Sequence, residues 1–430
     1  MGAIAAKAGE QLTLEHADRR ALLRQALDGI ATPLRRVLIV PPDGTRFNSG
    51  AGELTSLLYE MLAPAVHVDV LPALGTHAPM TESEIRAMFG HTIPMDRFLV
   101  HDWRAGVVHR GDIPGDVVAQ LSEGKLDYSV KIEVSRHLFD GYDRIFSVGQ
   151  IVPHEVAGMA NYSKNILVGA GGADIINKSH FLGAVYGMER IMGRADTPVR
   201  QLFQYGMETF LPDLPVTYVF TVMARGRDGD MQMRGLYIGE DRETYEAGAR
   251  LSQKVNLTLL ETPLPKVVVY LDPHEFKSTW LGNKAVYRTR MALADQGELI
   301  VLAPGLKMFG EDAEIDRLIR QYGYRGTEAT LRAVRENDDL QRNLSAAAHL
   351  IHGSSEGRFT ITYCPGPDVS AAEIEAVGFE AGDLTTVMKT YNPEHLQDGM
   401  NTLSSGEKVY FISNPALGLW ALRRKIETAT

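Results

Sequence analysis

Residues 36–46 have the sequence RVLIVPPDGTR, which is typical of a buried strand followed by a loop. Arg36 to Val40 form an apolar run, and the two prolines after it end the strand. A helix is expected next, from about Glu53 to Leu62. Strand, loop and helix therefore follow one another directly at the start of the chain.

The same pattern repeats further along the chain. VHVDVLPAL predicts a second strand, and TESEIRAMFG has the pattern with which a helix begins. DRIFSVGQIVPHEV predicts a third strand that leads into a loop. This alternation predicts an α/β protein with largely parallel sheets.

Three loops are expected at the carboxyl ends of these strands, after Val40, Leu74 and Val152. In parallel sheets, ligands bind beyond the carboxyl ends of the strands. All three loops carry polar residues of the types that catalysis uses. The sequence therefore predicts a functional site at this edge of the sheet.

A domain boundary is expected at ETPLPKVVVYLDP, where two prolines precede a new apolar strand. We interpret residues 1–265 as an N-terminal cofactor-binding catalytic domain, joined by residues 406–430. Residues 266–405 are interpreted as a second α/β domain that closes the cleft. The active site is expected in the cleft between the two.

Composition narrows the function classes. A chain of 430 residues is long enough for two large domains, and a net charge of −10 disfavours nucleic acids and anionic membranes as partners. The single cysteine, Cys364, excludes a disulfide within the chain and a thiolate metal cluster, and it is interpreted as a small buried residue. Without a signal-peptide pattern or an apolar run of about 18 residues, the chain is expected to be a cytoplasmic enzyme.

Histidines follow two of the predicted strands, at His77 and His154, and His180 lies further on in INKSHFLGAVYG. A single histidine is most often a hydrogen-bonded scaffold residue. Two histidines in two loops at one sheet edge indicate more, because imidazole exchanges protons near neutral pH. A pair that faces a substrate from both sides would supply one base for each face, as a racemase or epimerase needs.

Two further stretches have both a structural and a functional interpretation. Asp43–Arg46, DGTR, is a good turn, or it presents Arg46 as a fork for a carboxylate or phosphate. Lys164 is a solvated surface lysine, or a desolvated amine used for covalent attachment. The chain has no Walker motif, no GxGxxG and no HExxH, so nucleotide binding or zinc binding by those devices is unsupported.

Taken together, DGTR, GTH, PHEVAGM, NYSKN and NKSH resemble the lactate racemase family, whose members carry a nickel-pincer nucleotide. Lys164 lies ten residues after His154, and His180 lies sixteen residues after Lys164. The resemblance covers most of the chain and is densest between Val40 and Gly193.

The resemblance implies a function and a set of roles. Lys164 would carry the cofactor covalently, and His180 would bind the nickel, whose other ligands come from the cofactor. His77 and His154 would be the two catalytic bases, and Asp43, Thr45 and Arg46 would contact cofactor or substrate. The enzyme would invert C2 of a 2-hydroxy acid by reversible hydride transfer to the cofactor. Its partners would be this small substrate and the enzymes that assemble the cofactor.

The resemblance is incomplete around the substrate. Phe47-Asn48-Ser49 follows Arg46 where lactate-specific members have proline, and Ala78 stands where they have arginine. The expected substrate is therefore a polar or longer acid of the aldonic type rather than lactate. The expected substrate-binding residues are Arg46, Asn48, Lys284 and Arg288. HLIHGSSEGRF, with His349 and His352, either lines the cleft or is a solvated loop.

Two other functions compete with this one. A non-catalytic carrier of the nickel nucleotide would need only Lys164 and His180, so the presence of His77 and His154 disfavours it. A zinc-type hydrolase that uses His77, His154 and His180 lacks an accompanying carboxylate motif. Metal analysis and the intact protein mass would separate the three.

Overall fold

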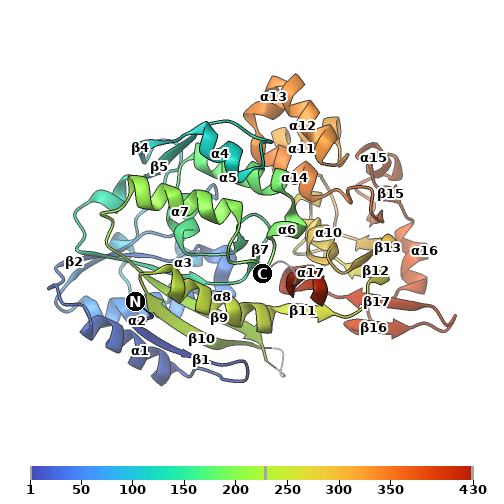
Figure 1. Cartoon of the computed structure of the whole chain (residues 1–430). Coiled ribbons are helices and arrows are strands. Elements are labelled where there is room, and N and C mark those ends of the chain that lie inside the picture. The colour runs from blue at the N-terminus through green and yellow to red at the C-terminus, as the bar shows by residue number, and fades with distance from the viewer. Residues whose placement is uncertain (1, 227–229, 428–430) are drawn as a thin grey trace. The chain divides into compact units, whose positions relative to one another are not determined.

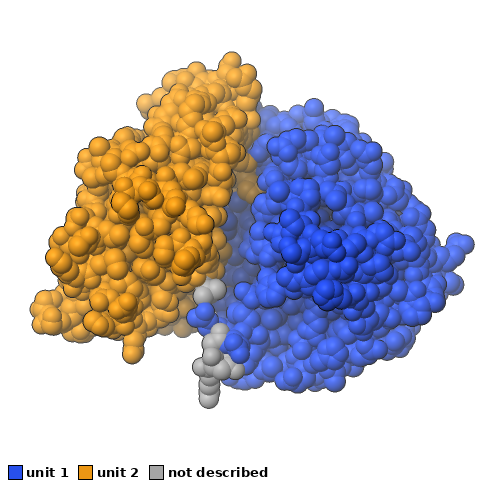
Figure 2. Space-filling model, turned by 180° about the vertical axis from the view of Figure 1, so that it is seen from behind, with its two compact units in different colours: residues 1–179, 192–256 blue, residues 180–191, 257–430 orange. Residues whose placement is uncertain are grey.

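The computed structural model describes residues 2–226 and 230–427, and Figure 1 labels their helices and strands. Clustering of contacts divides the chain into two compact units. Unit 1 comprises residues 1–179 and 192–256, and unit 2 comprises residues 180–191 and 257–430, coloured separately in Figure 2. None of the described helices combines the length and the apolar composition that a membrane span requires.

Unit 1 is built on a six-stranded sheet with the order β1-β10-β9-β6-β2-β3. The last four of these strands are parallel; β10 pairs with β9 in antiparallel orientation, and β1 pairs with β10 in the same way. The strands are β1 (Ala5–Ala8), β2 (Arg36–Val40), β3 (His67–Val70), β6 (Arg144–Gln150), β9 (Val216–Arg225) and β10 (Met231–Gly239).

The central strands of this sheet are apolar because both of their faces are covered. Val37 to Val40 of β2 are fully buried. Helices α1 (His16–Asp28), α2 (Ala51–Leu62) and α3 (Glu82–Phe89) share one hydrophobic core with residues of β2, β3 and β9. Thr81 and Glu84 form the capping box that starts α3, as the sequence predicted.

Shorter elements connect these parts of unit 1. The helices are α4 (Gly115–Leu121), α7 (Pro198–Phe210) and α8 (Arg242–Asn256), and the short helical turns are η1 (Gly44–Ser49), η2 (Met95–Arg97), η3 (Arg136–Phe139) and η4 (Asn165–Gly169). Two small antiparallel pairs are formed by β4 (Val107–Ile113) with β5 (Val130–Ser135) and by β7 (Pro153–His154) with β8 (Gly158–Met159). Helix α5 (Ala173–Tyr186) begins in unit 1 and ends in unit 2.

Unit 2 contains a second six-stranded sheet, with the order β15-β14-β13-β12-β17-β16. All of its strands are parallel except β16. They are β12 (Leu264–Tyr270), β13 (Leu293–Ala303), β14 (Thr360–Pro365), β15 (Glu380–Ala381), β16 (Gly399–Thr402) and β17 (Lys408–Ile412), and β11 (Leu257–Leu260) pairs separately with β18 (Leu419–Leu422). The prediction of an α/β fold with largely parallel sheets is confirmed.

The helices of unit 2 are mostly short. They are α6 (Met188–Ile191), α9 (Thr279–Gly282), α10 (Lys284–Thr289), α11 (Ala313–Tyr322), α12 (Thr327–Glu336), α13 (Asp338–Arg342), α14 (Leu344–His352), α15 (Ala371–Ala376), α16 (Leu384–Thr390) and α17 (Arg423–Glu427), with a helical turn η5 (Pro415–Leu417). Neighbouring strands of this sheet are consecutive in the described chain, except that β12 lies next to β17.

The two units differ from the expected division of the chain in two segments. The sequence pattern groups residues 406–430 with the N-terminal domain, whereas β17 pairs with β12 and β18 pairs with β11, both inside unit 2. The pattern also groups residues 180–191 with that domain, whereas their contacts lie in unit 2. Pairing of distant strands places residues 406–430 in unit 2, and residues 180–191 form ion pairs there. Interactions between residues far apart in the chain leave no local pattern in the sequence.

Candidate active site

Three loops of unit 1 meet at one edge of its sheet. Strands β6, β2 and β3 are neighbours and parallel, so their carboxyl ends lie together. Asp43 follows β2, His77 follows β3 and His154 follows β6. This arrangement is the one that the sequence predicted for a ligand site.

Asp43 is held between two partners. Its carboxylate is 5% exposed, and its Oδ2 accepts a hydrogen bond from Nδ1 of His77 over 2.6 Å. Its Oδ1 accepts from the hydroxyl of Thr45 over 2.5 Å and from the backbone N–H of Thr45 over 3.2 Å. Burial raises the pKa of Asp43, but the bonds from His77 and Thr45 outweigh burial and leave the pKa below its ordinary value. Asp43 is therefore a carboxylate that orients the His77 ring.

His154 is buried in a tight hairpin. Strands β7 and β8 pair Pro153 with Met159 and His154 with Gly158, which adopts the left-handed φ of 82° that glycine tolerates. Nδ1 of His154 accepts hydrogen bonds from the backbone N–H groups of Val156, over 3.1 Å, and of Ala157, over 3.3 Å. The turn therefore fixes the orientation of the ring.

Lys164 lies in a loop that is fastened to the same strand ends. The side-chain amide of Asn165 donates to the carbonyl of Val40 over 3.0 Å and to the hydroxyl of Ser147 over 2.9 Å. The N–H of Gly75, in the His77 loop, donates to the carbonyl of Gly169 over 2.8 Å. These bonds attach the Lys164 segment to the ends of β2 and β6 and to the loop after β3.

A buried arginine supports this loop from α7. Arg200 donates to the carbonyls of Met159, over 2.7 Å, and Asn161, over 3.0 Å, and to the hydroxyl of Ser163 over 3.0 Å. Asn161 and Tyr162 both adopt left-handed φ values, 69° and 59°, which strain residues other than glycine. Arg200 thus holds a backbone that the loop would not adopt by itself.

The surroundings of Lys164 disfavour a charged amine. The pKa of Lys164 is lowered from 10.5 to about 8, and burial is the largest cause. The nearby guanidinium of Arg46 is the second cause, and Arg200 contributes less. Glu155 and Asp43 act in the opposite direction. Lys164, Arg46 and Asp43 therefore lie within electrostatic range of one another, as the predicted site requires.

The DGTR loop forms the helical turn η1, which Asp43 caps. Thr45, Arg46 and Asn48 are exposed on this turn, and so is the ring of Phe47, which is 59% exposed. Ser49 is different, because it is buried and its hydroxyl accepts from the N–H of Ala51 at the start of α2. Ser49 therefore serves the fold, while Arg46 and Asn48 remain available to a ligand.

The other predicted site residues belong to unit 2. His180 is partly buried in α5, in the part of that helix that clusters with unit 2. Lys284 and Arg288 are partly buried on α10, four residues apart and so on one face of the helix. The ammonium of Lys284 lies 5.6 Å from the ring centroid of Phe276.

His349 and His352 do not lie in a solvated loop, which was one of the two alternatives that the sequence left open. Both are buried in α14, and His349 stacks on Trp280 with ring centroids 4.3 Å apart. Burial lowers the pKa of His349 to about 3, so this ring is neutral, and its Nε2 pairs with the hydroxyl of Tyr324 over 3.0 Å. Cys364 is fully buried, as predicted, and burial raises the pKa of its thiol to about 12.

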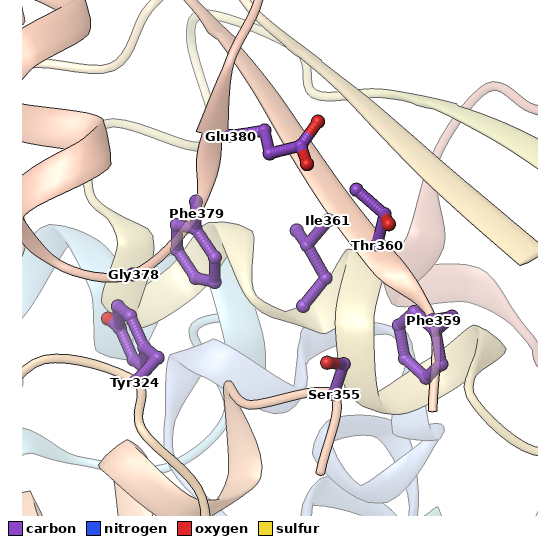
Figure 3. A pocket seen from close by; sticks show the side chains of 8 residues that line it. All are labelled: Tyr324, Ser355, Phe359, Thr360, Ile361, Gly378, Phe379 and Glu380. Carbon is purple, nitrogen blue, oxygen red and sulfur yellow. The ribbon is translucent and has the colours of Figure 1, made fainter. Parts of the chain in front are cut away.

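Unit 2 contains a cavity. Figure 3 shows it at the start of β14 and β15, the amino ends of parallel strands, where ligand sites are uncommon. It contains none of the predicted site residues, and its lining is Tyr324, Ser355, Phe359, Thr360, Ile361, Gly378, Phe379 and Glu380.

The described part of the chain contains no group of three or more His, Cys, Asp or Glu residues that is arranged to hold a metal ion. The amine of Lys164, whose pKa is lowered, is suited to acylation, so this residue fits the covalent attachment of a cofactor.

Sequence reasoning missed Arg200, Asn165 and Glu155. Arg200 stands in TPVRQLF, where the surrounding apolar residues indicate a buried helix face and the arginine looks like an exposed exception. Its burial depends on the carbonyls of a loop about 40 residues earlier, which no local pattern reveals.

Comparisons with known proteins show what the chain is similar to. Residues 3–191 match the family of the lactate racemase N-terminal domain. None of the curated proteins matches the chain.

Two solved structures share the fold. A crystal structure of a protein from Thermotoga maritima is 22% identical, with a TM-score of 0.79 over 97% of this chain and 100% of that one. The lactate racemase apoprotein from Thermoanaerobacterium thermosaccharolyticum is 15% identical, with a TM-score of 0.69 over 94% of this chain and 92% of that one. The chain is thus similar to the lactate racemase N-terminal domain over residues 3–191, and it shares its fold with these two structures.

Proposed function

We propose that this protein is a racemase or epimerase that inverts C2 of a 2-hydroxy acid. The match of residues 3–191 to the lactate racemase N-terminal domain supports such a function in general. The observation that carries the proposal is the Asp43–His77 pair, which lies in the same loop cluster as an amine whose pKa is lowered. A proton acceptor and an attachment point for a cofactor are thereby combined at one sheet edge.

The cofactor that we propose is the nickel-pincer nucleotide, attached through Lys164 and with its nickel bound by His180. An amine with a pKa of about 8 is deprotonated at neutral pH about 300 times more often than one with a pKa of 10.5. Lys164 is therefore a better nucleophile than a surface lysine. When bound, this group supplies a carbon that accepts hydride from C2 and returns it.

The protein's own contribution is to bind, orient and exchange a proton. Because Nδ1 of His77 donates to Asp43, its Nε2 carries a lone pair that can accept the proton of the substrate hydroxyl. The Asp43 carboxylate then stabilises the imidazolium that forms. In this proposal the exposed guanidinium of Arg46, three residues after Asp43, binds the substrate carboxylate as a fork.

The proposed substrate is a polar or longer acid of the aldonic type. The exposed amide of Asn48, two residues after Arg46, supports this choice because it can bond to further hydroxyls. We propose Lys284 and Arg288, which share a face of α10, as further contacts of the substrate.

The attachment of the cofactor is tested by mass. Protein produced together with the cofactor-assembling enzymes is expected to contain nickel and a covalent adduct in its intact mass. Lys164→Ala is expected to lose the adduct. Lys178→Ala is the matched control, because Lys178 lies on α5 and its ammonium is paired with Asp174 over 2.7 Å. This variant is expected to keep the adduct. An intact adduct on Lys164→Ala contradicts the assignment.

The reaction is tested with a panel of 2-hydroxy acids that carry deuterium at C2. Epimerisation of a polar or aldonic acid with the label retained is expected, because hydride returns to the carbon that it left. Washing of the label into solvent would indicate proton abstraction at C2 instead. Nickel and an adduct without turnover of any acid would favour a cofactor carrier.

A further inference from the structure

A glycine-rich turn, Gly169–Gly172, directly precedes helix α5. Its sequence, GAGG, is typical of a flexible turn, yet the structure packs it tightly. A β-carbon at Gly171 would lie 1.8 Å from the carbonyl oxygen of Leu167. A β-carbon at Gly172 would lie 2.7 Å from the β-carbon of Glu133. The turn therefore has one defined position, which a side chain at either glycine would disturb.

Three successive carbonyls of this turn accept hydrogen bonds from three separate segments of unit 1. The carbonyls of Gly169 and Ala170 accept from the backbone N–H groups of Gly75 and Ser135, each over 2.8 Å. The third carbonyl, that of Gly171, is bonded by a side chain. Whereas the first two donors belong to the backbone, the third can be removed by a substitution.

The third donor is the ring of His101, whose Nε2 lies 3.0 Å from the carbonyl oxygen of Gly171. A carbonyl can only accept, so Nε2 carries a proton. His101 is 2% exposed, and its Nδ1 has no hydrogen-bond partner among the residues that the structure describes. Burial lowers the pKa of this ring, the charge of His137 adds to the effect, and that of Asp102 opposes it. The ring is therefore a neutral donor.

The segment that carries His101 is itself fastened on both sides. Two residues before it, the N–H of Leu99 donates to the carbonyl of Val70, the last residue of β3, over 2.8 Å. After it, the carbonyl of Gly106 accepts from the N–H of Arg136, directly after β5, over 2.9 Å. The imidazole therefore extends from a fixed backbone to the turn.

The turn in its turn adjoins the proposed attachment residue. The N–H of Ala170 donates back to the carbonyl of Asn165 over 3.1 Å, and Asn165 directly follows Lys164. We propose that His101 is a positioning residue, which holds the Lys164 loop in place through its bond to Gly171. The proposal rests on the proposed function only for the group that Lys164 carries.

The first measurement uses the cofactor-free protein and an acylating reagent. The rate at which Lys164 is labelled, followed by mass across a pH series, should have its midpoint near pH 8 in the wild type. His101→Leu leaves the Gly171 carbonyl without its donor, so the turn loosens and water reaches the amine. The midpoint should then move upward by about one pH unit or more, because burial is the main cause of the lowered pKa of Lys164.

Two further variants show whether the hydrogen bond is responsible. His101→Gln keeps a neutral N–H donor near the position of Nε2 and should restore the wild-type midpoint. His137→Leu is the matched control, because the ring of His137 pairs with Asp140 over 3.0 Å and not with the turn. It should leave the midpoint unchanged. An unchanged midpoint in His101→Leu overturns the proposal, and so does a midpoint in His101→Gln that equals the one in His101→Leu.

The wild-type protein provides a test that does not depend on the folding of His101→Leu. Histidine labelled with ¹⁵N gives separate signals for protonated and unprotonated ring nitrogens, and the signals that disappear in His101→Gln belong to His101. At neutral pH we expect a protonated Nε2 and an unprotonated Nδ1. A proton on Nδ1 contradicts the proposed bond to Gly171.

Failure of this proposal is distinguishable from failure of the proposed function. Protein that acquires no adduct when it is produced with the cofactor-assembling enzymes contradicts the proposed function. The labelling profile and the ring signals need neither cofactor nor substrate, so they test the role of His101 in either case.

Discussion

Lys164 illustrates how a single residue can oppose the stability of the fold that it serves. Burial and the neighbouring Arg46 lower its pKa to about 8. Protonation of the amine at neutral pH therefore lowers the free energy of unfolding. In the unfolded chain the same amine is solvated, with a pKa near 10.5. Residues whose surroundings disfavour them in this way are common at functional sites.

We therefore predict that Lys164→Met stabilises the cofactor-free protein at neutral pH, by up to about 3 kcal/mol. Between pH 8 and 10.5 the unfolded wild-type chain binds more protons than the folded one, so wild-type stability rises with pH in this window. The advantage of the variant should shrink accordingly. Tm values of both proteins at neutral pH and at about pH 9.5 check this sign. A difference in Tm that does not change with pH would exclude a charged, desolvated amine.

At the scale of the element, the loop from Met159 to Gly169 depends on a helix that follows it in the chain. Two of its residues have strained left-handed φ values, and Arg200 of α7 bonds to its carbonyls and to Ser163. Arg200 also donates a hydrogen bond to the hydroxyl of Tyr245 over 3.1 Å. The buried guanidinium therefore substitutes for secondary structure in this loop.

Arg200→Met is expected to destabilise the protein by about 3–5 kcal/mol, because it leaves several buried acceptors without a donor. It should also raise the pKa of Lys164, because a nearby positive charge is lost. The rate at which an acylating reagent labels Lys164, measured by mass across a pH series, should then shift to higher pH. Arg250→Met, an exposed arginine of α8, is the control and should change neither quantity. An unchanged labelling profile in Arg200→Met would leave Arg200 with a purely structural role.

The elements differ in how far the sequence could predict them. Local patterns sufficed for β2, which is an apolar run followed by two prolines, and for α3, which begins with a capping box. The cluster of Asp43 and His77 was foreseeable from strand order alone, since parallel strands bring their loops to one edge. The support of Lys164 by Arg200 was not, because it joins residues that only the tertiary fold brings together.

At the scale of the molecule, one segment of chain belongs to the unit that follows it. Residues 180–191 cluster with unit 2, although the chain returns to unit 1 at residue 192. Glu189 fastens this segment. Its carboxylate binds Arg290 over 3.3 Å, Lys425 over 2.9 Å, and Arg358 as well. Burial raises the pKa of Glu189, but the three cations outweigh burial and leave it below its ordinary value.

Glu189→Gln should therefore destabilise unit 2 by about 2–3 kcal/mol at neutral pH, because three partly buried cations lose their shared carboxylate. A carboxyl group with a depressed folded pKa contributes fully above pH 4.5 and loses its contribution as the pH falls through the folded value. The gap between wild type and variant should thus close in acid. Tryptophan fluorescence during urea unfolding reports mainly on unit 2, which contains Trp280 and Trp420.

The control for this measurement is Glu261→Gln, which removes an exposed pair with Arg423 and should cost no more than about 0.5 kcal/mol. If Glu189→Gln is equally mild, residues 180–191 are held in unit 2 by apolar packing alone. If its effect persists in acid, the loss comes from the shape of the side chain and not from its charge. A large loss of unfolding free energy at neutral pH that disappears in acid would show that the charge of the Glu189 carboxylate stabilises residues 180–191, which include His180.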